Sequence, residues 1–357
     1  MSDEISAEGG AGPSALARVP RPVQVGLYLT NQHPVGSDMV EALRGQIRLL
    51  HHARDHGWDS VWGGQHFLPT MAMTQPVPFL ARLAAEAGEM RVGLGVLLLA
   101  LANPLEVAET FASMDVVCDG RFTLGVGLGY RDVEYDAFGI GRRERVRRLE
   151  ENLRLVEALW VGETVSADLP WCRLDGASLT ILPVQRPRPP LWMAADADRA
   201  VERAARMADT WIVNPHTTTS TIARQLALFE RVRRELGRPR LPELPAIKEV
   251  VCGPTRARAL EMAKPYLSVK YEAYRAWGQD AALPADETFD LPFERLLQER
   301  FVIGTPEDCL RELLAWRDRL GVDHFIFRPF WSGMPVETAL ESMQLLSREV
   351  IPTLRER

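Results

Sequence analysis

The stretch DGRFTLGVGLGY, residues 119–130, decides the fold. Its run from Phe122 to Val126 is typical of a buried strand, and the glycines at 125, 127 and 129 alternate through its end. Glycine lets backbone N–H groups approach an oxyanion or a ring with no side chain in between. The stretch is not a dinucleotide-binding fingerprint, because no βαβ dinucleotide unit surrounds it. The pattern of the rest of the chain is needed to interpret this stretch.

Strand-like runs alternate with helical ones along the chain, which indicates a parallel sheet covered by helices. The runs are Val23 to Leu29, Ser60 to Gly63, Val92 to Leu99, Phe122 to Val126, Leu191 to Ala194, Thr210 to Val213, Ala246 to Val251 and His324 to Arg328. With 357 residues the chain is long enough for an α/β barrel of about 250 residues with excursions. We therefore expect a (β/α)₈ TIM barrel with insertions at its C-terminal mouth.

We expect a disordered tail over residues 1–21 and one barrel domain over residues 22–357, with excursions near 162–190 and 264–300. The second excursion, which is rich in tyrosine and tryptophan, is interpreted either as a lid or as an insertion packed on its own barrel. Apolar residues at spacings of three and four predict a helix from Arg142 to Trp160. Another helix should begin at Thr305-Pro306-Glu307-Asp308, which has the hydroxyl cap and the proline of a helix start.

Composition excludes several classes of function. The net charge of −6, with basic residues spread along the chain, argues against nucleic-acid binding. The longest apolar run, Val92 to Ala102, is too short to span a bilayer. The four cysteines lie far apart and form no C-x-x-C pair, which favours a reducing cytoplasm. The seven histidines form no metal-binding cluster with carboxylates, so we expect no metal site.

Four segments together resemble the bacterial-luciferase-like, flavin-dependent oxidoreductases. They are the stretch at 119–130 with the following Arg131 to Glu134, GWDSVWGGQHF at 57–67, VGLGVLLLALANP at 92–104, and PRPPLWMAADADRAV at 187–201. They occur in the family's order, and the likeness extends from about Val23 to Pro352. It implies a flavin site at the C-terminal mouth of a barrel.

The resemblance implies that His66, at a strand end, is the catalytic residue, since an imidazole there can act as acid, base or hydrogen-bond donor. Gln65 stands where the family has an acidic residue, which puts a proton relay through that position in doubt. The resemblance also implies a cis peptide between Gly95 and Val96, under the flavin ring.

The cofactor contacts implied by the resemblance lie at strand ends and at one helix start. They are Gly95, Val96, Gly127, Gly129, Tyr130, Arg131, Ala195, Asp196, Ala197 and Arg199. Arg131 and Arg199 are the candidates for an anionic group, whereas the arginines of 142–148 are expected on a solvated helix face. Residues at or just past strand ends are expected in the substrate pocket: Tyr28, Asn31, His33, Gln65 and Trp331.

The first hypothesis is a monooxygenase in which reduced FMN and O₂ oxygenate a small organic substrate. No nicotinamide site is visible, so reduced flavin would come from a separate NAD(P)H-dependent flavin reductase. The alternatives are hydride transfer with an 8-hydroxy-5-deazaflavin and a flavin-binding protein without turnover. A homo-oligomer, such as a dimer, is expected.

Overall fold

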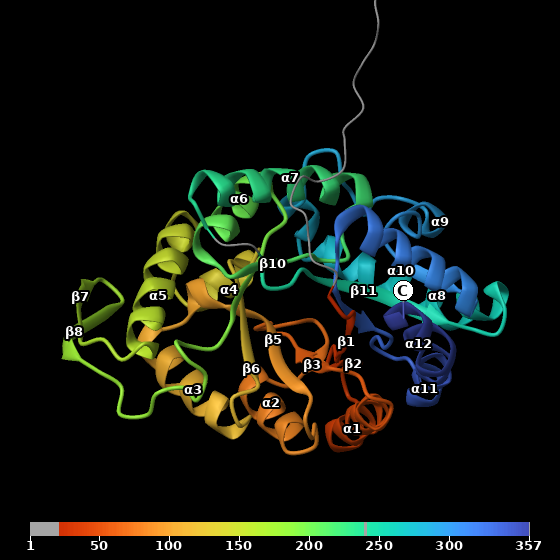
Figure 1. The fold of residues 1–357 in the computed structure, drawn as a ribbon, viewed down its shortest axis with the longest axis horizontal. Helices are drawn as coiled ribbons and strands as arrows, with labels where there is room; N and C mark the ends of the chain where they lie inside the picture. Colours follow the sequence, from red (N-terminus) through yellow and green to blue (C-terminus); the bar gives the residue numbers. More distant parts are fainter. Residues whose placement is uncertain (1–20, 239–240, 357) are drawn as a thin grey trace, which may run out of the picture.

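The computed structural model describes residues 21–238 and 241–356, so the expected N-terminal tail lies outside the described residues except for Arg21. Its centre is a curled sheet of nine strands in the order β10-β9-β6-β5-β3-β1-β13-β11-β12 (Figure 1). The strands are β1 Gln24–Tyr28, β3 Ser60–Gly63, β5 Arg91–Leu98, β6 Phe122–Gly127, β9 Leu191–Ala194, β10 Thr210–Ile212, β11 Pro245–Cys252, β12 Val302–Gly304 and β13 His324–Arg328. The fold is α/β.

Every ladder of this sheet is parallel, so the carboxyl ends of its strands meet at one edge. Each of the eight predicted runs corresponds to one of its strands, and β12 was not predicted. Next to β10, Val213 forms a parallel bridge with Ala246 of β11, so the two flanks of the curled sheet approach each other there.

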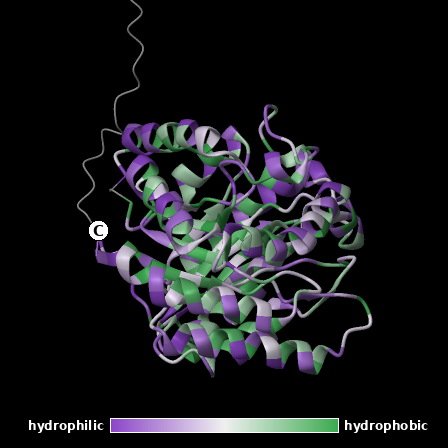
Figure 2. Ribbon diagram, turned by 90° about the vertical axis from the view of Figure 1, so that its right-hand side faces the viewer, coloured by the Kyte–Doolittle hydropathy of each residue, from purple (hydrophilic) through white to green (hydrophobic). Residues whose placement is uncertain are grey.

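The helices that follow the strands cover the outside of the sheet (Figure 1). They are α1 Met39–Asp55, α2 Pro76–Ala84, α3 Pro104–Val117, α4 Asp132–Ala137, α5 Arg145–Trp160, α6 Asp198–Met207, α7 Thr219–Glu235, α8 Arg256–Ala276, α9 Phe293–Leu296, α10 Pro306–Leu320, α11 Val336–Leu345 and α12 Ile351–Glu356. Short 3₁₀ or π segments are η1 Leu99–Leu101, η2 Arg142–Glu144, η3 Gln279–Ala282 and η4 Leu346–Val350. Apolar strands lie at the centre and the helices alternate in polarity (Figure 2).

Two helix starts can be compared with their predictions. α10 begins where expected, because the Thr305 hydroxyl accepts from Asp308 N and the Asp308 carboxylate accepts from Thr305 N. α5 begins at Arg145, three residues later than predicted, because Arg142–Glu144 form the separate turn η2. The arginines at 142 and 145 therefore belong to different local structures.

Aromatic side chains fill the inside of the curled sheet below the carboxyl ends. The rings of Trp62 and Trp192 stack with centroids 4.6 Å apart, and both side chains are buried. Gly93 makes room for this stack, since a Cβ at that position would lie 2.1 Å from the Trp62 ring. His324 completes the layer through a 2.8 Å hydrogen bond to Ser60 Oγ. This packed layer leaves open space only towards the carboxyl edge of the sheet.

The two excursions differ in where they lie. Part of residues 162–190 forms an antiparallel hairpin, β7 Val165–Leu169 and β8 Cys172–Ala177, which projects from the side of the molecule beyond α5 (Figure 1). Residues 264–300 comprise most of α8, then η3 and α9. Two further short strands, β2 Gln32–His33 and β4 Ala72–Met73, pair beside the carboxyl edge. None of the helices in the described ranges is long and apolar enough to cross a membrane.

Candidate active site

A cavity of about 330 Å³ lies at the carboxyl edge of the sheet. Its wall is formed by residues that end or follow β1, β3, β5, β6, β9, β10 and β13. Many of the predicted site residues line it: Tyr28, Gln65, His66, Gly95, Val96, Gly127, Gly129, Tyr130, Ala195, Asp196 and Ala197. The other predicted ones, Asn31, His33, Arg131, Arg199 and Trp331, are not among its lining residues.

One wall of the cavity is formed by the ends of β5 and β6. The peptide between Gly95 and Val96 is cis, as predicted, and β5 is irregular between Leu94 and Leu97. The Gly95 carbonyl accepts a 2.6 Å hydrogen bond from the Tyr28 hydroxyl. At Gly127 a Cβ would lie 2.9 Å from the Val96 side chain, so the neighbouring strand needs glycine to make room for Val96. The wall therefore consists of the Gly95–Val96 peptide and the small side chain of Val96, and a flat ring can lie against it.

His66 has a carboxylate partner that sequence reasoning did not identify. Its Nδ1 lies 3.1 Å from Glu134 Oε1, and the same oxygen accepts from Phe67 N at 2.9 Å. The Glu134 side chain is buried at 1% exposure, whereas His66 is reached from the cavity. Gln65 instead accepts a hydrogen bond from Leu98 N at 2.9 Å. The missing acidic residue at 65 is thus replaced by Glu134, which belongs to the segment that follows the glycine stretch.

Arg131 is buried and fixes the loop after β3. Its guanidinium donates to the carbonyls of Phe67 at 2.6 Å and Leu68 at 2.9 Å, and it lies 4.5 Å from the Trp277 ring. Arg199 is exposed on the first turn of α6. Neither arginine therefore faces the cavity, and both remain untested as cofactor ligands.

Four other guanidinium groups line the cavity instead. Three of them, those of Arg142, Arg145 and Arg203, are called here the guanidinium cluster, and the fourth is that of Arg328. Arg142 pairs with Asp132 and Arg203 pairs with Glu150 at 2.9 Å, whereas Arg145 forms no ion pair with any described residue. Burial lowers the pKa of Arg145, and the charges of Arg142 and Arg203 lower it further. The expectation of a solvated face was wrong for Arg148, which is buried and donates to Ala100 O at 2.8 Å. It was incomplete for Arg142 and Arg145, which line the cavity, although Arg142 is exposed.

The start of α6 lies beside this cluster. Ala197 occupies the cap position without a side-chain hydrogen bond, so N–H groups of the first turn stay free of a side-chain cap. Ala195, Asp196, Ala197 and Ala200 line the cavity here. Burial raises the pKa of Asp196 to about 7, and Asn214 donates a hydrogen bond to its carboxylate. A helix start with nearby guanidinium groups is suited to an anion such as a phosphate.

The structure places two of the five predicted substrate residues at the cavity and three outside its lining. Tyr28 and Gln65 line the cavity, but Asn31 donates to Thr74 O at 2.8 Å, His33 packs on Phe330, and Trp331 donates to a buried carboxylate. The structure adds lining residues that the sequence did not reveal: His216, Tyr274, Gln279 and Arg328. Tyr274 and Gln279 come from the second excursion, so that excursion lies at the cavity.

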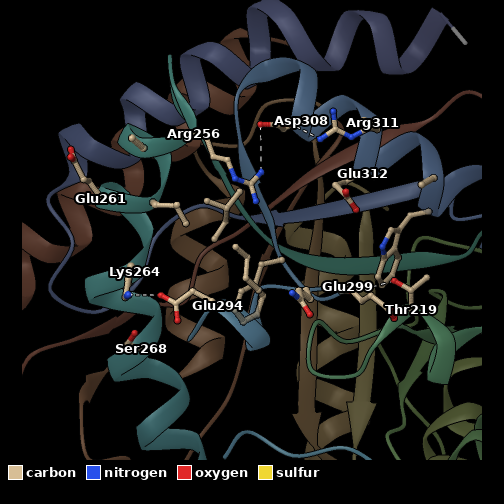
Figure 3. Close-up of a pocket in the computed structure, with 18 of the residues that line it drawn as sticks. Thr219, Arg256, Glu261, Lys264, Ser268, Glu294, Glu299, Asp308, Arg311 and Glu312 are labelled. Atoms are coloured by element: carbon tan, nitrogen blue, oxygen red, sulfur yellow. Dashed lines mark hydrogen bonds and ion pairs between the residues drawn. The ribbon is translucent and has the colours of Figure 1, made fainter. Parts of the chain in front are cut away.

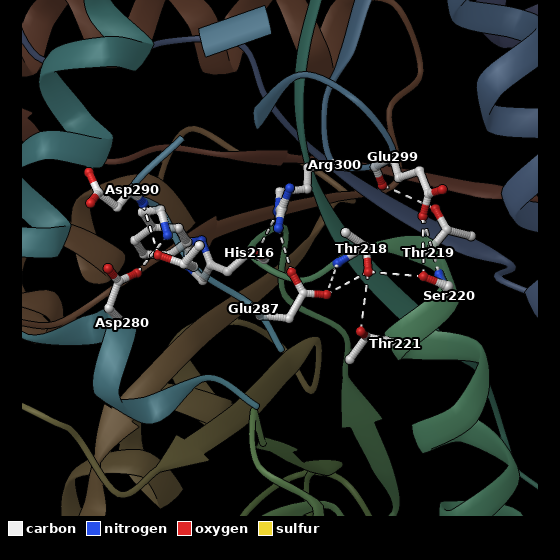
Figure 4. A network of polar contacts seen from close by, with 12 residues as sticks. His216, Thr218, Thr219, Ser220, Thr221, Asp280, Glu287, Asp290, Glu299 and Arg300 are labelled. Carbon is white, nitrogen blue, oxygen red and sulfur yellow. Dashed lines mark hydrogen bonds and ion pairs between the residues drawn. The ribbon is translucent and has the colours of Figure 1, made fainter. Parts of the chain in front are cut away.

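A polar network holds the second excursion against the loop after β10 (Figure 4). Arg300 pairs with Glu287 and donates to the carbonyl of His216 at 2.9 Å. Glu287 also accepts from Thr218 N at 2.8 Å. Burial lowers the pKa of His216 well below its ordinary value, and nearby Lys270 and Arg328 add to this effect. His216 is therefore a neutral lining residue near pH 7.

A larger groove of about 1110 Å³ lies elsewhere, between α8 and α10 over β12 (Figure 3). Its charged side chains are largely matched with one another: Lys264 with Glu294 at 2.6 Å, and Asp308 with both Arg256 and Arg311. It lacks the wall formed by Gly95, Val96 and Gly127 and the His66 pair. The smaller cavity is therefore the better candidate for chemistry, even though the groove is more spacious.

The cavity fits a flavin with an anionic tail. Among the described residues, three buried polar atoms of side chains that line it have no hydrogen-bond partner, Tyr130 Oη, Gln279 Oε1 and Arg328 Nε. The wall formed by Gly95, Val96 and Gly127 is suited to a ring, and the guanidinium cluster beside α6 is suited to a phosphate. The described ranges contain no group of three or more His, Cys, Asp or Glu residues that could hold a metal.

Comparisons with known proteins also support a flavin-type cofactor. The sequence model of the luciferase-like monooxygenases matches residues 23–324. The oxygenase component of a flavin-dependent trigonelline monooxygenase from Acinetobacter baylyi is 24% identical over 87% of this chain and 89% of its own length. An F420-dependent glucose-6-phosphate dehydrogenase from Nakamurella multipartita is 26% identical over 85% of this chain and 90% of its own.

Solved structures share the fold. A monooxygenase from Streptomyces bottropensis superposes with a TM-score of 0.81 at 22% identity, covering 92% of this chain and 99% of that one. The oxygenating constituent of 3,6-diketocamphane monooxygenase from Pseudomonas putida, solved with FMN, superposes with a TM-score of 0.77 at 17% identity, covering 92% and 98%. The relatives thus include flavin-dependent monooxygenases and F420-dependent oxidoreductases. With the family match spanning most of its length, this chain belongs to the luciferase-like monooxygenases.

Proposed function

We propose that the chain is the oxygenase component of a two-component monooxygenase, which takes reduced FMN from a separate NAD(P)H-dependent reductase and oxygenates a small organic substrate with O₂. The observation that carries the proposal is the pairing, in one cavity, of the wall formed by Gly95, Val96 and Gly127 with the guanidinium cluster beside the start of α6. That arrangement suits a flat ring joined to a single phosphate. The A. baylyi relative, an oxygenase component, supports the same assignment.

In this proposal Gly95, Val96 and Gly127 lie along the flavin ring, and Arg142, Arg145 and Arg203 hold its phosphate. Bound reduced FMN would supply the electrons that activate O₂. The protein contributes His66, whose Nδ1 is held by Glu134 and whose Nε2 is left to hold or move a proton in the cavity. The apolar side chains around the cavity exclude water from that proton.

A second candidate function is hydride transfer with an F420-type deazaflavin. The N. multipartita relative favours it, because it is F420-dependent and as similar in sequence as the oxygenase component. The guanidinium cluster would also accept the anionic tail of a deazaflavin. FMN and F420 differ in one decisive property, since the deazaflavin does not activate O₂.

The test compares the two cofactors directly. Purified protein is titrated with FMN and with F420, each oxidised and reduced, and binding and O₂ uptake are recorded. We expect stoichiometric FMN binding and, with candidate substrates, O₂ uptake that depends on the protein. Tighter binding of F420 than of FMN, with oxidation of reduced F420 that leaves O₂ unchanged, would establish the second function instead.

We propose further that the described domain is one complete (β/α)₈ barrel that begins near residue 22. The Val213–Ala246 bridge supports closure between β10 and β11. The Val213 carbonyl also accepts from Ile247 N at 2.8 Å, and Val213 N donates to Pro245 O at 2.9 Å. Closure of this kind would place all carboxyl ends around one mouth.

A further inference from the structure

A buried charge cluster lies on the side of the cavity formed by β11, β13 and α8. It consists of Glu249, Lys270 and Arg328. The Glu249 carboxylate is fully buried, pairs with Lys270, and accepts from Arg328 Nη1 at 3.0 Å. The indole of Trp331 donates to the second oxygen of Glu249 at 2.7 Å. Both oxygens of the Glu249 carboxylate therefore already accept hydrogen bonds from the surrounding side chains.

The cluster contains two cations and one carboxylate. Its positive excess is moderated by aromatic rings, since Arg328 lies 4.1 Å from the Tyr28 ring and Lys270 lies 5.0 Å from the Tyr274 ring. Aromatic faces do not replace a counter-charge, and an unmatched buried cation is costly. Burial, and after it the charge of Arg328, lowers the pKa of Lys270 to about 7, so Lys270 is charged in only part of the molecules near pH 7 and the positive excess is present when it is protonated.

Arg328 is the member of the cluster that reaches the cavity. Its side chain is only 6% exposed, and its Nε has no hydrogen-bond partner among the described residues. Gln279 Oε1 is a second buried polar atom on the cavity wall without a described partner. The side chains of Ile247 and Leu283 line the cavity as well. A ligand on this side of the cavity meets the Arg328 guanidinium, whose Nε has no partner among the described residues, next to apolar side chains.

This side is distinct from the one assigned to the flavin phosphate. Arg328 ends β13, whereas the guanidinium cluster belongs to η2, α5 and α6, and α6 follows β9. In the sheet order β13 and β9 are separated by β1, β3, β5 and β6, and across the Val213–Ala246 bridge they are still separated by β10 and β11. We therefore assign the phosphate to one group of cations only.

We propose that Arg328 binds a carboxylate of the organic substrate, so that the substrate is an organic acid with an apolar body. A carboxylate presents two coplanar oxygens to a guanidinium edge, and such charge-assisted hydrogen bonds are strong in a buried site. The bound anion supplies the counter-charge that the cluster lacks. The proposal rests on the proposed function, because it takes the remaining cavity to be the flavin site.

The experiment measures ligand binding without turnover. Benzoate and its neutral match benzamide are titrated by calorimetry into the protein, alone and saturated with FMN, and inorganic phosphate is added as a competitor. We expect benzoate to bind at least about 10-fold more tightly than benzamide. Arg328→Met should abolish that preference, and Arg328→Lys should keep part of it.

Matched controls locate the effect. Arg231→Met, on the outer surface of α7, should leave benzoate and FMN binding unchanged, and Arg145→Met should weaken FMN binding but not benzoate binding.

Equal affinities for benzoate and benzamide in the wild-type protein overturn the proposal. So does a benzoate preference that survives in Arg328→Met, or one that phosphate and Arg145→Met remove. If Arg328→Met does not fold, Arg328→Lys and the wild-type comparison decide. Failure of the proposed function appears separately, as absent FMN binding.

Discussion

In the proposed function, proton movement in the cavity depends on His66 and Glu134. In His66→Ala the wall formed by Gly95, Val96 and Gly127 and the guanidinium cluster stay intact, so flavin affinity should change little. Turnover should fall by about 10²- to 10⁴-fold, the usual contribution of general acid–base catalysis. Single-turnover rates with reduced FMN, measured beside flavin affinity, check this.

Glu134→Gln provides the companion measurement for His66. It keeps a hydrogen-bond acceptor beside Nδ1 but removes the charge, so the pH profile of turnover should shift while the fold is retained. Unchanged turnover in His66→Ala, with the wild-type pH profile, would make His66 structural. Loss of flavin from that variant would make it a cofactor ligand.

Arg145 is the member of the guanidinium cluster without an ion pair to any described residue. Arg145→Met should weaken FMN binding by about 10- to 100-fold, because a charge-assisted hydrogen bond to phosphate is lost. Riboflavin, which lacks the phosphate, should bind the variant and the wild type equally. Arg143→Met, exposed in the same segment, is the matched control and should bind FMN normally. Equal losses of affinity for FMN and for riboflavin would show that this cluster does not bind the phosphate.

Under the proposed function, Asp196 should make FMN affinity depend on pH. Burial raises its pKa from 3.8 to about 7, so the folded protein holds the proton that the unfolded chain releases. The stability from this group is fully present below about pH 3.8 and is lost as pH rises through about 7. Above that pH the carboxylate also repels a phosphate at α6. Asp196→Asn should therefore bind FMN more tightly than wild type at pH 8, by up to about 10-fold, and equally at pH 6. If the ratio of the two FMN affinities were the same at pH 6 and pH 8, this role of Asp196 would be contradicted.

At this scale the sequence predicted much of the cavity but not its charges. The glycines at 95 and 127 were found because their spacing follows the family pattern. Glu134 was not assigned a role, because its contact with His66 joins residues 68 positions apart. Arg148 was misjudged because the acidic residues around it suggest a solvated face, whereas it is buried against Ala100, 48 positions away in the chain. The place of Arg142 and Arg145 at the cavity was missed because it depends on contacts between distant parts of the chain.

Among the elements, the second excursion should respond to ligand. Tyr274 and Gln279 line the cavity, and Arg300 and Glu287 tie the segment to the loop after β10 (Figure 4). FMN should slow proteolysis between residues 278 and 292 by filling the space that these side chains line. The β7–β8 hairpin, which does not line the cavity, is the internal control and should be cut at an unchanged rate. Equal protection of both segments would indicate global stabilisation instead.

The elements were predicted better than their ends. All eight strand runs are present because buried parallel strands are continuous apolar runs that sequence reveals. β12 was missed because it has three residues, Val302–Gly304, directly before the capped start of α10. Its burial comes from pairing with β11, a contact about fifty residues away in the chain, which no local pattern contains.

For the whole molecule, FMN binding should appear as stability. Ligand at about 100 times its Kd adds about 2.7 kcal/mol to the free energy of unfolding. At about 2.1 cal/mol/K of unfolding entropy per residue, each kcal/mol corresponds to about 1.3 °C for a chain of 357 residues, so Tm should rise by about 3–4 °C. Thermal unfolding with FMN, riboflavin and no ligand measures this, and Arg145→Met should show a smaller rise with FMN. A Tm that FMN leaves unchanged would count against a flavin site in this cavity.

The cavity takes its lining residues from different parts of the chain. Arg142, Arg145 and Arg203 come from its middle, whereas Tyr274, Gln279 and Arg328 come from its last third. Under the proposed function the two groups can diversify independently during evolution: exchanging residues 264–300 together with Arg328 for the matching residues of a relative should change which molecule enters, while the proposed phosphate contacts are kept. A chimera made in that way is the natural starting point for engineering new selectivity on this scaffold.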